Sequence, residues 1–295
     1  MLFVKLRGLE IQSAIVLGNL TIDDVVLPNG ATIMASLGGN SIHVATGVFV
    51  NGVTPITIAR MGEDFPVEAL EKFEVAGLTT EFMIPIVGPT VRNWVIYEWD
   101  GSRTWLYRTE KTRSLEVSPE PEDITEAALD GVGVAHIAAM PLANAERLVA
   151  RLREMAPEIR IVLDTHEDWI EGYQGRVIAL ARRVNYFVPS KEELIILMET
   201  PELELAMAKL STHDIENIIV KAGAQGAFLL GKHGHQHVTA RDTLVKDTTG
   251  AGDAFCGGLT AGIALDLPIY DCVVMGCETA GRAITRSGSL RLLDM

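Results

Sequence analysis

Cysteine is scarce in this sequence of 295 residues, which contains only Cys256, Cys272 and Cys277. Their number is odd and no two of them show C-x-x-C spacing, which argues against a disulfide framework and against a zinc site. We therefore expect reduced thiols that pack as small apolar side chains, as is usual in the cytosol.

Positive charge and long apolar runs are also lacking. The chain has 25 Lys and Arg residues against 39 Asp and Glu residues, a formal net charge of −14. This balance argues against nucleic acid or an anionic membrane as a partner, because both need a basic face. No run approaches the ~18 apolar residues of a membrane span, and residues 1–12 lack an apolar core of signal-peptide length. We expect a soluble cytoplasmic protein.

Two familiar phosphate-binding motifs are missing as well. The sequence contains neither G-x-x-x-x-G-K-[ST] nor G-x-G-x-x-G. Their absence argues against a P-loop kinase and against a dinucleotide-dependent dehydrogenase. With 48% hydrophobic residues, the chain can nevertheless bury a large core.

Apolar runs alternate with helical patterns from residue 13 onward. The run Ala14-Ile15-Val16-Leu17 is typical of a strand that is buried on both faces. Further strands are predicted at 55–59, 134–138, 159–164, 185–188 and 217–221, and helices at 42–51, 66–76, 143–155 and 176–183. This alternation predicts a single α/β domain, 1–295, with a doubly wound, mostly parallel sheet and ligands at its carboxyl edge.

Two segments interrupt this alternation. Residues 30–37 and 82–108 have the pattern of β-hairpins. In the second, Asp100-Gly101 is the expected turn between strands 91–99 and 103–107.

The residues from Asp247 to Phe255, DTTGAGDAF, carry the strongest chemical signal. They open a small-residue segment that we predict to be a helix to about Ala264, with Thr248 or Thr249 as its N-cap. Glycines at a helix start let a ligand approach the backbone, and the positive end of the helix attracts anions. A carboxylate at Asp253 can then accept a proton from a hydroxyl group.

This stretch resembles the C-terminal signature D-T-x-G-A-G-D-x-F of the ribokinase-like (PfkB) family of carbohydrate and nucleoside kinases. The resemblance covers nearly all of 13–290, although only this stretch is specific by itself. It implies an ATP-dependent, Mg²⁺-dependent kinase with Asp253 as the base and Gly250, Ala251 and Gly252 as the anion hole. It also implies that segments 30–37 and 82–108 form a small β lid. The alternative is an ordinary glycine-rich helix start.

The resemblance also implies an acceptor site. Asp23 ends a G-x-x-x-x-D pattern that starts at Gly18, where the family places a ligand of sugar hydroxyls. The further positions implied are Gly38, Gly39, Asn40 and His43, in a stretch that resembles the family's N-terminal signature. His43 stands where the family usually has asparagine. Asp23 in a solvated turn and His43 as a packed or capping residue are the structural alternatives.

Two further stretches resemble the family's nucleotide site. Ser190 and Glu193 match an N-x-x-E motif in which the glutamate helps to organise Mg²⁺ through water, with serine in place of asparagine. The same S-x-x-E spacing is a helix capping box, and both interpretations can hold together. Residues Lys221, Gly223 and Gly226 match a nucleotide-binding strand and loop, in which Lys221 can contact a phosphate.

A monovalent cation site is implied by the same resemblance. Its ligands map to Asp247, Thr249, Ala283, Arg286 and Gly288, so K⁺ is expected to raise activity. Separately, His233, His235 and His237 alternate along an expected exposed hairpin. Three imidazoles suggest a metal, but no carboxylate follows them.

The acceptor stays open at this stage. A sugar or sugar-like molecule is the main hypothesis. A nucleoside is favoured if His43 and the aromatic residues of the lid stack on a base, and the aromatic residues concerned are Trp94, Tyr97, Trp99 and Trp105. A phosphosugar is favoured if Arg92, Arg103 and Arg108 face it, and a catalytically silent sugar-binding protein is the fourth alternative. Exposed lid edges give a physical reason for a homodimer through the lid.

Overall fold

The computed structural model describes residues 12–99, 103–110, 113–231 and 234–293. The strands are β1 (Ser13–Leu17), β2 (Thr21–Val26), β3 (Thr32–Gly38), β4 (Thr54–Met61), β5 (Met83–Pro85), β6 (Val91–Tyr97), β7 (Arg103–Tyr107), β8 (Val134–Ile137), β9 (Arg160–Leu163), β10 (Tyr186–Phe187), β11 (Ile218–Lys221), β12 (Ala227–Gly231) and β13 (Gly234–Val238). The α-helices are α1 (Asn40–Phe49), α2 (Val67–Val75), α3 (Arg113–Val117), α4 (Glu126–Leu129), α5 (Leu142–Met155), α6 (Gln174–Ala181), α7 (Lys191–Met198), α8 (Leu203–Leu210), α9 (Ala251–Ala264) and α10 (Ile269–Ala283).

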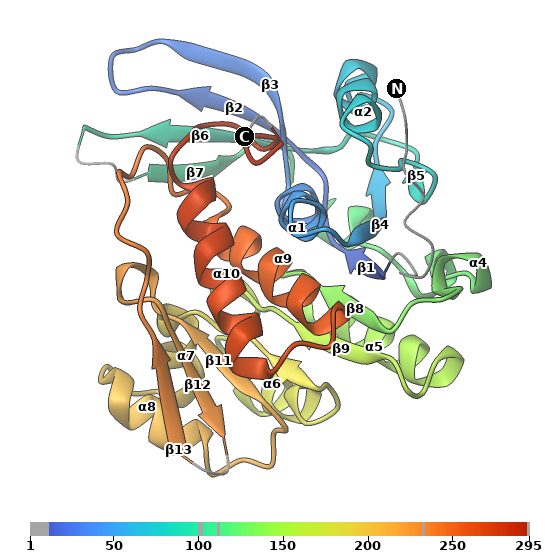
Figure 1. The fold of residues 1–295 in the computed structure, drawn as a ribbon. Coiled ribbons are helices and arrows are strands. Elements are labelled where there is room, and N and C mark those ends of the chain that lie inside the picture. Colours follow the sequence, from blue (N-terminus) through green and yellow to red (C-terminus); the bar gives the residue numbers. More distant parts are fainter. Residues whose placement is uncertain (1–11, 100–102, 111–112, 232–233, 294–295) are drawn as a thin grey trace.

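A nine-stranded sheet forms the centre of the molecule, in the order β13-β12-β11-β10-β9-β8-β1-β4-β5 (Figure 1). Its strands from β11 to β5 pair in parallel, whereas β12 and β13 are antiparallel additions at one edge. The carboxyl ends of the parallel strands therefore meet along one edge, as the alternating sequence pattern predicts.

Helices cover both faces of this sheet. Helices α5, α6, α7 and α8 pack their apolar side chains against one face of the sheet. The core formed there includes Leu148, Leu180 and Leu194. Helices α1, α9 and α10 cover the opposite face, where Val44, Leu259 and Val273 are buried. The predicted doubly wound α/β architecture is confirmed.

Helices α1 and α9 approach each other at two glycines. A Cβ atom on Gly257 would lie 2.4 Å from the carbonyl oxygen of Val44 and 2.8 Å from the Cα atom of Gly47. Only glycine leaves room for this contact. The small residues of 251–264 thus let α9 lie deep in the core, which holds its first turn in place.

A second, four-stranded sheet has the order β3-β2-β6-β7 and lies apart from the main sheet (Figure 1). It contains the predicted strands near 32–37 and 91–107, but it differs from prediction in two ways. Met83–Pro85 pairs with β4 in the main sheet, so the lid does not begin at residue 82. Thr21–Val26 is a strand of this small sheet, paired with β3 and β6, rather than the solvated turn that was the alternative for Asp23, because Asp23 and Asp24 find partners within the sheet.

The start of α9 also differs from prediction. Gly250 is the N-cap, with φ of +66°, and no side chain caps the helix. The prediction of Thr248 or Thr249 as N-cap is wrong, because the left-handed conformation at this position favours glycine. The expected turn at Asp100-Gly101 lies outside the described residues. Within the described part of the chain, no helix is long and apolar enough to span a bilayer.

Candidate active site

Two cavities meet at the N-terminus of α9. One, of about 480 Å³, includes Thr248, Ala251 and Gly252 in its wall. The other, of about 580 Å³, includes Thr249, Gly250 and Asp253. Successive residues of one turn therefore face two different cavities. A group that passes from one cavity to the other must pass the positive end of this helix.

Backbone geometry prepares this turn for an anion. Amides in the first turn of a helix have no acceptor within the helix, and the first helical bond here runs from the Ala254 amide to the Gly250 carbonyl, at 2.8 Å. The Ala251 amide instead donates to the carbonyl of Thr248, at 3.1 Å. Of the three predicted anion-hole amides, that of Ala251 is thus already engaged within the turn.

His43, the departure from the family pattern, packs against the same turn. A Cβ atom on Gly250 would lie 2.5 Å from the His43 ring. His43 is buried in α1 and also borders the second cavity. Gly250 is therefore required both for its positive φ and for contact with this imidazole.

Asp23 and Asp253 both border the second cavity. The Asp23 carboxylate accepts hydrogen bonds from Asn93 Nδ2 and Thr21 Oγ1, each at 3.1 Å. Burial raises the pKa of Asp23, opposed by these two hydrogen bonds, and the neighbouring Asp24 raises it further. Asp23 lies on β2 and Asp253 on α9, so the small sheet and the main body each supply one carboxylate.

The other predicted acceptor residues shape this cavity. A Cβ atom on Gly38 would lie 2.0 Å from Asp23 Oδ2, so glycine is needed beside this carboxylate. Gly39, with φ of +103°, is the N-cap of α1. The side chain of Asn40 accepts from the Asn19 amide at 2.8 Å and donates to the Ala139 carbonyl at 2.6 Å. Asn40 therefore ties together the loops that follow β1 and β8.

Aromatic side chains complete the wall of the second cavity. Trp105 and Tyr107 come from β7, and Trp169 comes from the loop after β9. The other three aromatic lid residues do not border it: Trp94 lies under the Arg108 guanidinium, 4.9 Å from its ring centre, Tyr97 bonds to Asp247, and Trp99 is 81% exposed.

The lid arginines have an internal partner. Arg92 donates to both carboxylate oxygens of Asp24, at 2.7 and 2.9 Å, and Arg108 also donates to Asp24. The hydrogen bond from Arg92, followed by those from the Ala35 amide and Arg108, holds the pKa of the buried Asp24 well below its usual range against the effect of burial. Neither arginine borders the second cavity, and the side chain of Arg103 lies outside the described residues.

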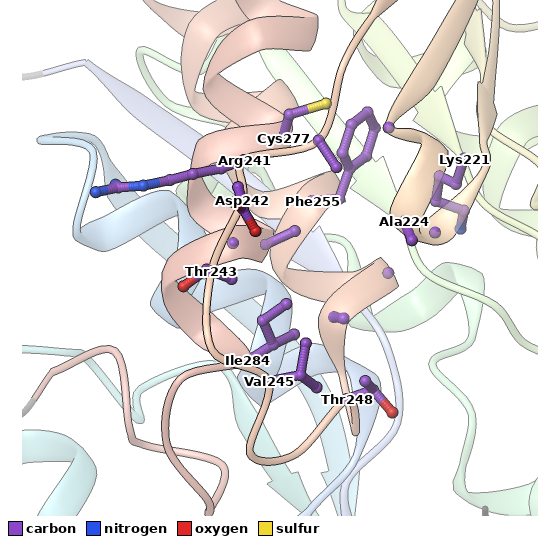
Figure 2. A pocket seen from close by; sticks show the side chains of 17 residues that line it. Lys221, Ala224, Arg241, Asp242, Thr243, Val245, Thr248, Phe255, Cys277 and Ile284 are labelled. Carbon is purple, nitrogen blue, oxygen red and sulfur yellow. The ribbon is translucent and has the colours of Figure 1, made fainter. Parts of the chain in front are cut away.

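The first cavity has mainly apolar walls and is bordered by the loop after β11. Figure 2 shows Phe255, Val245 and Ile284 around it, with Lys221 and Ala224 on one side. Gly223 and Gly226 both border it, with φ of +56° and +90°. A Cβ atom on Gly226 would lie 2.0 Å from the carbonyl oxygen of Val238. The predicted nucleotide loop and the start of α9 therefore share one cavity.

Lys221 ends β11 in a buried cluster of charge. Its Nζ lies 2.6 Å from Asp164 Oδ1 and 4.0 Å from Cys256 Sγ. Burial alone would lower the pKa of Lys221, but Asp164, Cys256 and Glu193 outweigh it and raise this pKa. A Cβ atom on Gly252 would lie 3.8 Å from Lys221 Nζ, so the ammonium lies beside the first turn of α9.

Ser190 and Glu193 form the capping box at the start of α7. Ser190 Oγ accepts from the Glu193 amide at 3.1 Å, and Glu193 Oε2 accepts from the Ser190 amide at 2.7 Å. Burial raises the pKa of Glu193 to about 8, although Lys221 acts to lower it. The donor chemistry fits Mg²⁺, which commonly uses one or two carboxylates together with water and substrate phosphates. Glu193 and Asp164 are the residues that would hold it.

The predicted monovalent cation ligands do come together. Asp247 Oδ1 accepts from the Thr249 amide at 2.8 Å and from the Tyr97 hydroxyl at 2.9 Å. Burial acts to raise the pKa of Asp247, but the hydrogen bonds from Thr249, the charge of Arg291 and the Tyr97 hydroxyl together lower it. Tyr97 and Arg291 belong to this cluster, and sequence reasoning did not assign either to it.

The alternating histidines do not form a metal site among the described residues. His237 stacks on Phe228, with ring centres 4.5 Å apart, and its Nε2 lies 2.6 Å from the Gln225 carbonyl oxygen. His235 is exposed, and His233 lies outside the described residues. In the parts of the chain that the structure covers, no three His, Cys, Asp or Glu side chains are grouped to hold a metal.

The fold and the site define an α/β enzyme with two small-molecule cavities that meet at a helix N-terminus. The family model described as pfkB family carbohydrate kinase matches residues 14–294. The chain therefore belongs to the pfkB family and is a phosphotransferase.

The relatives are kinases of sugars and nucleosides. A cytidine kinase of Thermococcus kodakarensis is 25% identical over 280 residues, which cover 93% of this chain and 96% of the relative. A Burkholderia thailandensis nucleoside kinase, solved with inosine, has a TM-score of 0.78 at 14% identity and covers 94% of this chain and 93% of its own. A Vibrio cholerae fructokinase double mutant, solved with fructose, ADP and potassium ion, has a TM-score of 0.77 at 20% identity and covers 97% and 96%. These two structures establish the shared ribokinase-like fold.

Proposed function

We propose that this kinase transfers the γ-phosphoryl group of ATP to a hydroxyl of a sugar or of the sugar part of a nucleoside. The observation that supports this most is the meeting of two cavities at the first turn of α9. ATP enters the cavity between the loop after β11 and α9, and the acceptor enters the cavity between Asp23 and Asp253.

In this mechanism, Asp253 accepts the proton of the acceptor hydroxyl. Asp23 holds neighbouring hydroxyls, so that the reacting oxygen faces the nucleotide cavity. The Gly250 and Gly252 amides and the positive end of α9 stabilise the charge on the transferring group. The Ala251 amide can contribute as well once its hydrogen bond to the Thr248 carbonyl is broken. Glu193 and Asp164 would hold Mg²⁺, which would neutralise part of the charge on the phosphates.

Lys221 has a second task in this proposal. Its ammonium lies beside Gly252 and is already paired with Asp164. It therefore positions Asp164 and Glu193 for the metal, and it contributes positive potential to the phosphates without leaving its partner.

A nucleoside acceptor is the second candidate. Trp105, Tyr107 and Trp169 border the acceptor cavity, and flat aromatic side chains favour stacking on a base. The cytidine kinase relative points the same way. A phosphosugar acceptor is disfavoured, because Arg92 and Arg108 are already paired with the buried Asp24.

A coupled assay of ADP release over sugars, nucleosides and sugar phosphates tests the proposal. Turnover with a nucleoside, and a KM that rises in Trp105→Ala for nucleosides but not for free sugars, would identify the base-stacking acceptor. Turnover with free sugars alone would select the sugar acceptor. Binding of acceptors without ADP release from any of them would contradict the kinase and favour a silent binding protein.

We also propose a cytoplasmic homodimer that forms through the small sheet. Its support is the apolar surface of this sheet, since Ile33, Met34 and Leu106 are each about half exposed. The outer strands β3 and β7 leave two edges for pairing with a second subunit.

A further inference from the structure

Arg291 is a buried charge beside the catalytic turn. It is only 3% exposed, although arginine is almost never fully buried unless it is paired. It follows Gly288 in the turns after α10, and it reaches back to the segment that leads into α9. A cation in this position must be matched by several acceptors.

Its acceptors are mostly backbone carbonyl groups. Arg291 Nη1 donates to the carbonyl oxygens of Arg286 at 2.9 Å and Asp247 at 3.3 Å, and Nη2 donates to that of Thr249. Nη1 also lies 3.1 Å from Asp247 Oδ2. The Arg291 amide donates to the carbonyl of Gly288, at 3.4 Å.

These acceptors are the residues that the family pattern assigns to a monovalent cation. Asp247, Thr249 and Arg286 bond to the guanidinium, and Gly288 bonds to the amide of the same residue. Ala283, the last of the expected ligands, packs in one apolar cluster with Leu292. A K⁺ ion would need the carbonyl oxygens of Asp247, Thr249 and Arg286, which the guanidinium already uses.

The charge balance leads to the same conclusion. The single negative charge of Asp247 is matched by the single positive charge of Arg291, and Asp247 Oδ1 also receives hydrogen bonds from Thr249 and Tyr97. A second cation placed beside the guanidinium would meet like-charge repulsion in a poorly solvated setting. The residues present therefore do not fit a monovalent cation.

We propose that Arg291 is an internal replacement for the monovalent cation and that this kinase works without K⁺. The guanidinium holds the carbonyl groups of Asp247 and Thr249, and Gly250 and the first turn of α9 follow directly. Arg291 is thus a positioning residue that fixes the phosphate-binding amides, a role that rests on the proposed function.

The first test compares cations on the unmodified full-length chain. Its melting temperature and its Kd for ADP are measured in chlorides of potassium, sodium and tetramethylammonium at equal ionic strength. A cation that binds the folded state raises its stability by mass action. We expect the same values in all three salts. A saturable rise in stability or in ADP affinity that is specific to K⁺ would overturn the proposal.

The second test removes the guanidinium. Arg291→Ala is expected to weaken ADP binding roughly tenfold, the scale of one lost charge-assisted hydrogen bond. Millimolar KCl or guanidinium chloride should restore part of this loss by entering the emptied site. Arg151→Ala, which removes a partly exposed arginine of α5, is the control and should respond to neither salt. Unchanged ADP affinity in Arg291→Ala would contradict the positioning role.

The outcomes separate this inference from the proposed function. If Arg291→Ala does not fold, the comparison of cations on the unmodified chain still decides whether K⁺ binds. Arg291→Lys, which keeps the charge but loses the planar guanidinium, then serves as the second variant. It should lose less ADP affinity than a substitution that removes the charge. If the unmodified chain does not bind ADP, the proposed function fails, and the melting temperatures alone decide the role of Arg291.

Discussion

Two carboxylates in the acceptor cavity have different surroundings and therefore different tasks. Asp23 is buried and receives hydrogen bonds from Asn93 and Thr21, so its oxygens are held in a fixed orientation. Asp253 lies in the first turn of α9, at the positive end of the helix dipole. In the proposed function, Asp23 holds hydroxyls of the acceptor in place and Asp253 accepts the proton of the reacting hydroxyl.

Asp253→Asn tests the assignment of the base. Turnover should fall by roughly 10²–10⁴-fold, because the amide cannot accept the hydroxyl proton. ADP affinity and melting temperature should stay near those of the parent. Asp271→Asn is the matched control, since Asp271 is an exposed aspartate in the first turn of α10. Parental turnover in a folded Asp253→Asn variant would exclude Asp253 as the base.

Glu193 should make the stability of the chain depend on pH. Burial raises its pKa to about 8 in the folded state, against ~4.3 in an unfolded chain. The folded state therefore favours the protonated carboxyl group, and between these two pKa values the group must take up a proton when the chain folds, which costs free energy. The contribution is fully present below the unfolded pKa and is lost as pH rises toward 8.

Urea unfolding of the ligand-free chain measures this effect between about pH 5 and pH 8, because this window lies between the unfolded and the folded pKa of Glu193. The free energy of unfolding should decrease with pH, and Glu193→Gln should make the curve flatter. Glu192→Gln, which changes an exposed neighbour in the same turn, should leave the slope unchanged. Equal slopes for the parent and Glu193→Gln would show that Glu193 is ionised throughout.

Among the secondary-structure elements, α9 depends most on the absence of side chains. Gly257→Ala places a methyl group against the backbone of α1, which must shift to accept it. We expect a loss of about 1–3 kcal/mol of stability, the usual range for overpacking. ADP affinity should fall as well, because a shift of α9 moves the amides of its first turn.

Gly175→Ala is the control for this prediction. Gly175 also lies inside a helix, α6, but a Cβ atom there meets no atom within 4 Å. Alanine should be neutral or stabilising by about 0.5–1 kcal/mol, since glycine is the poorer helix former. Equal melting temperatures for Gly257→Ala and the parent would show that the α1–α9 contact adapts without cost.

The elements that sequence could predict are those whose signal is local. Residues 14–17 are a continuous apolar run, residues 134–138 are apolar except for His136, and the strands β1 and β8 lie there. Ser190 and Glu193 are three residues apart, and the capping box forms as predicted. Residues 21–26 were missed as a strand, because Asp23 and Asp24 break the apolar pattern and find their partners on distant strands.

The same distinction separates the predicted part of the site from the missed part. The nine residues from Asp247 to Phe255 carry their chemistry in contiguous order, so the turn and its cavities could be anticipated. Arg291 could not, because it meets Asp247 across 44 residues and no local pattern marks it. Asp164 could have been predicted as a candidate, because an acidic residue at the carboxyl end of a predicted strand is a typical site residue.

At the scale of the whole molecule, the small sheet should respond to substrates. Its strands supply Asp23, Asn93 and Trp105 to the acceptor cavity. Binding of an acceptor and an ATP analogue should therefore slow hydrogen exchange in 91–99 and 103–107. We expect this because a lid that closes over the acceptor would exclude water and so prevent the hydrolysis of ATP. The strands of the main-sheet core, such as β8, serve as the internal control, because they should exchange slowly with or without ligands.

Light scattering tests the proposed dimer on the same samples. We expect the mass of two chains, and Leu106→Lys on the small sheet should reduce it to that of one chain. Leu205→Lys is the control, since Leu205 is similarly exposed but lies on α8. A monomeric parent together with unchanged exchange in β6 and β7 would contradict both the dimer and the lid.

The placement of Asp23 and Asp253 on separate layers has a mechanical consequence. An acceptor that bonds to both residues is a temporary cross-link between the small sheet and the main body. Part of its binding free energy is then used to fix the distance between two layers, so small fragments that reach only one carboxylate cannot fix it. Acceptors that lack one hydroxyl group should therefore show a larger fall in kcat than in binding affinity. The missing group connects the two layers rather than merely adding one contact.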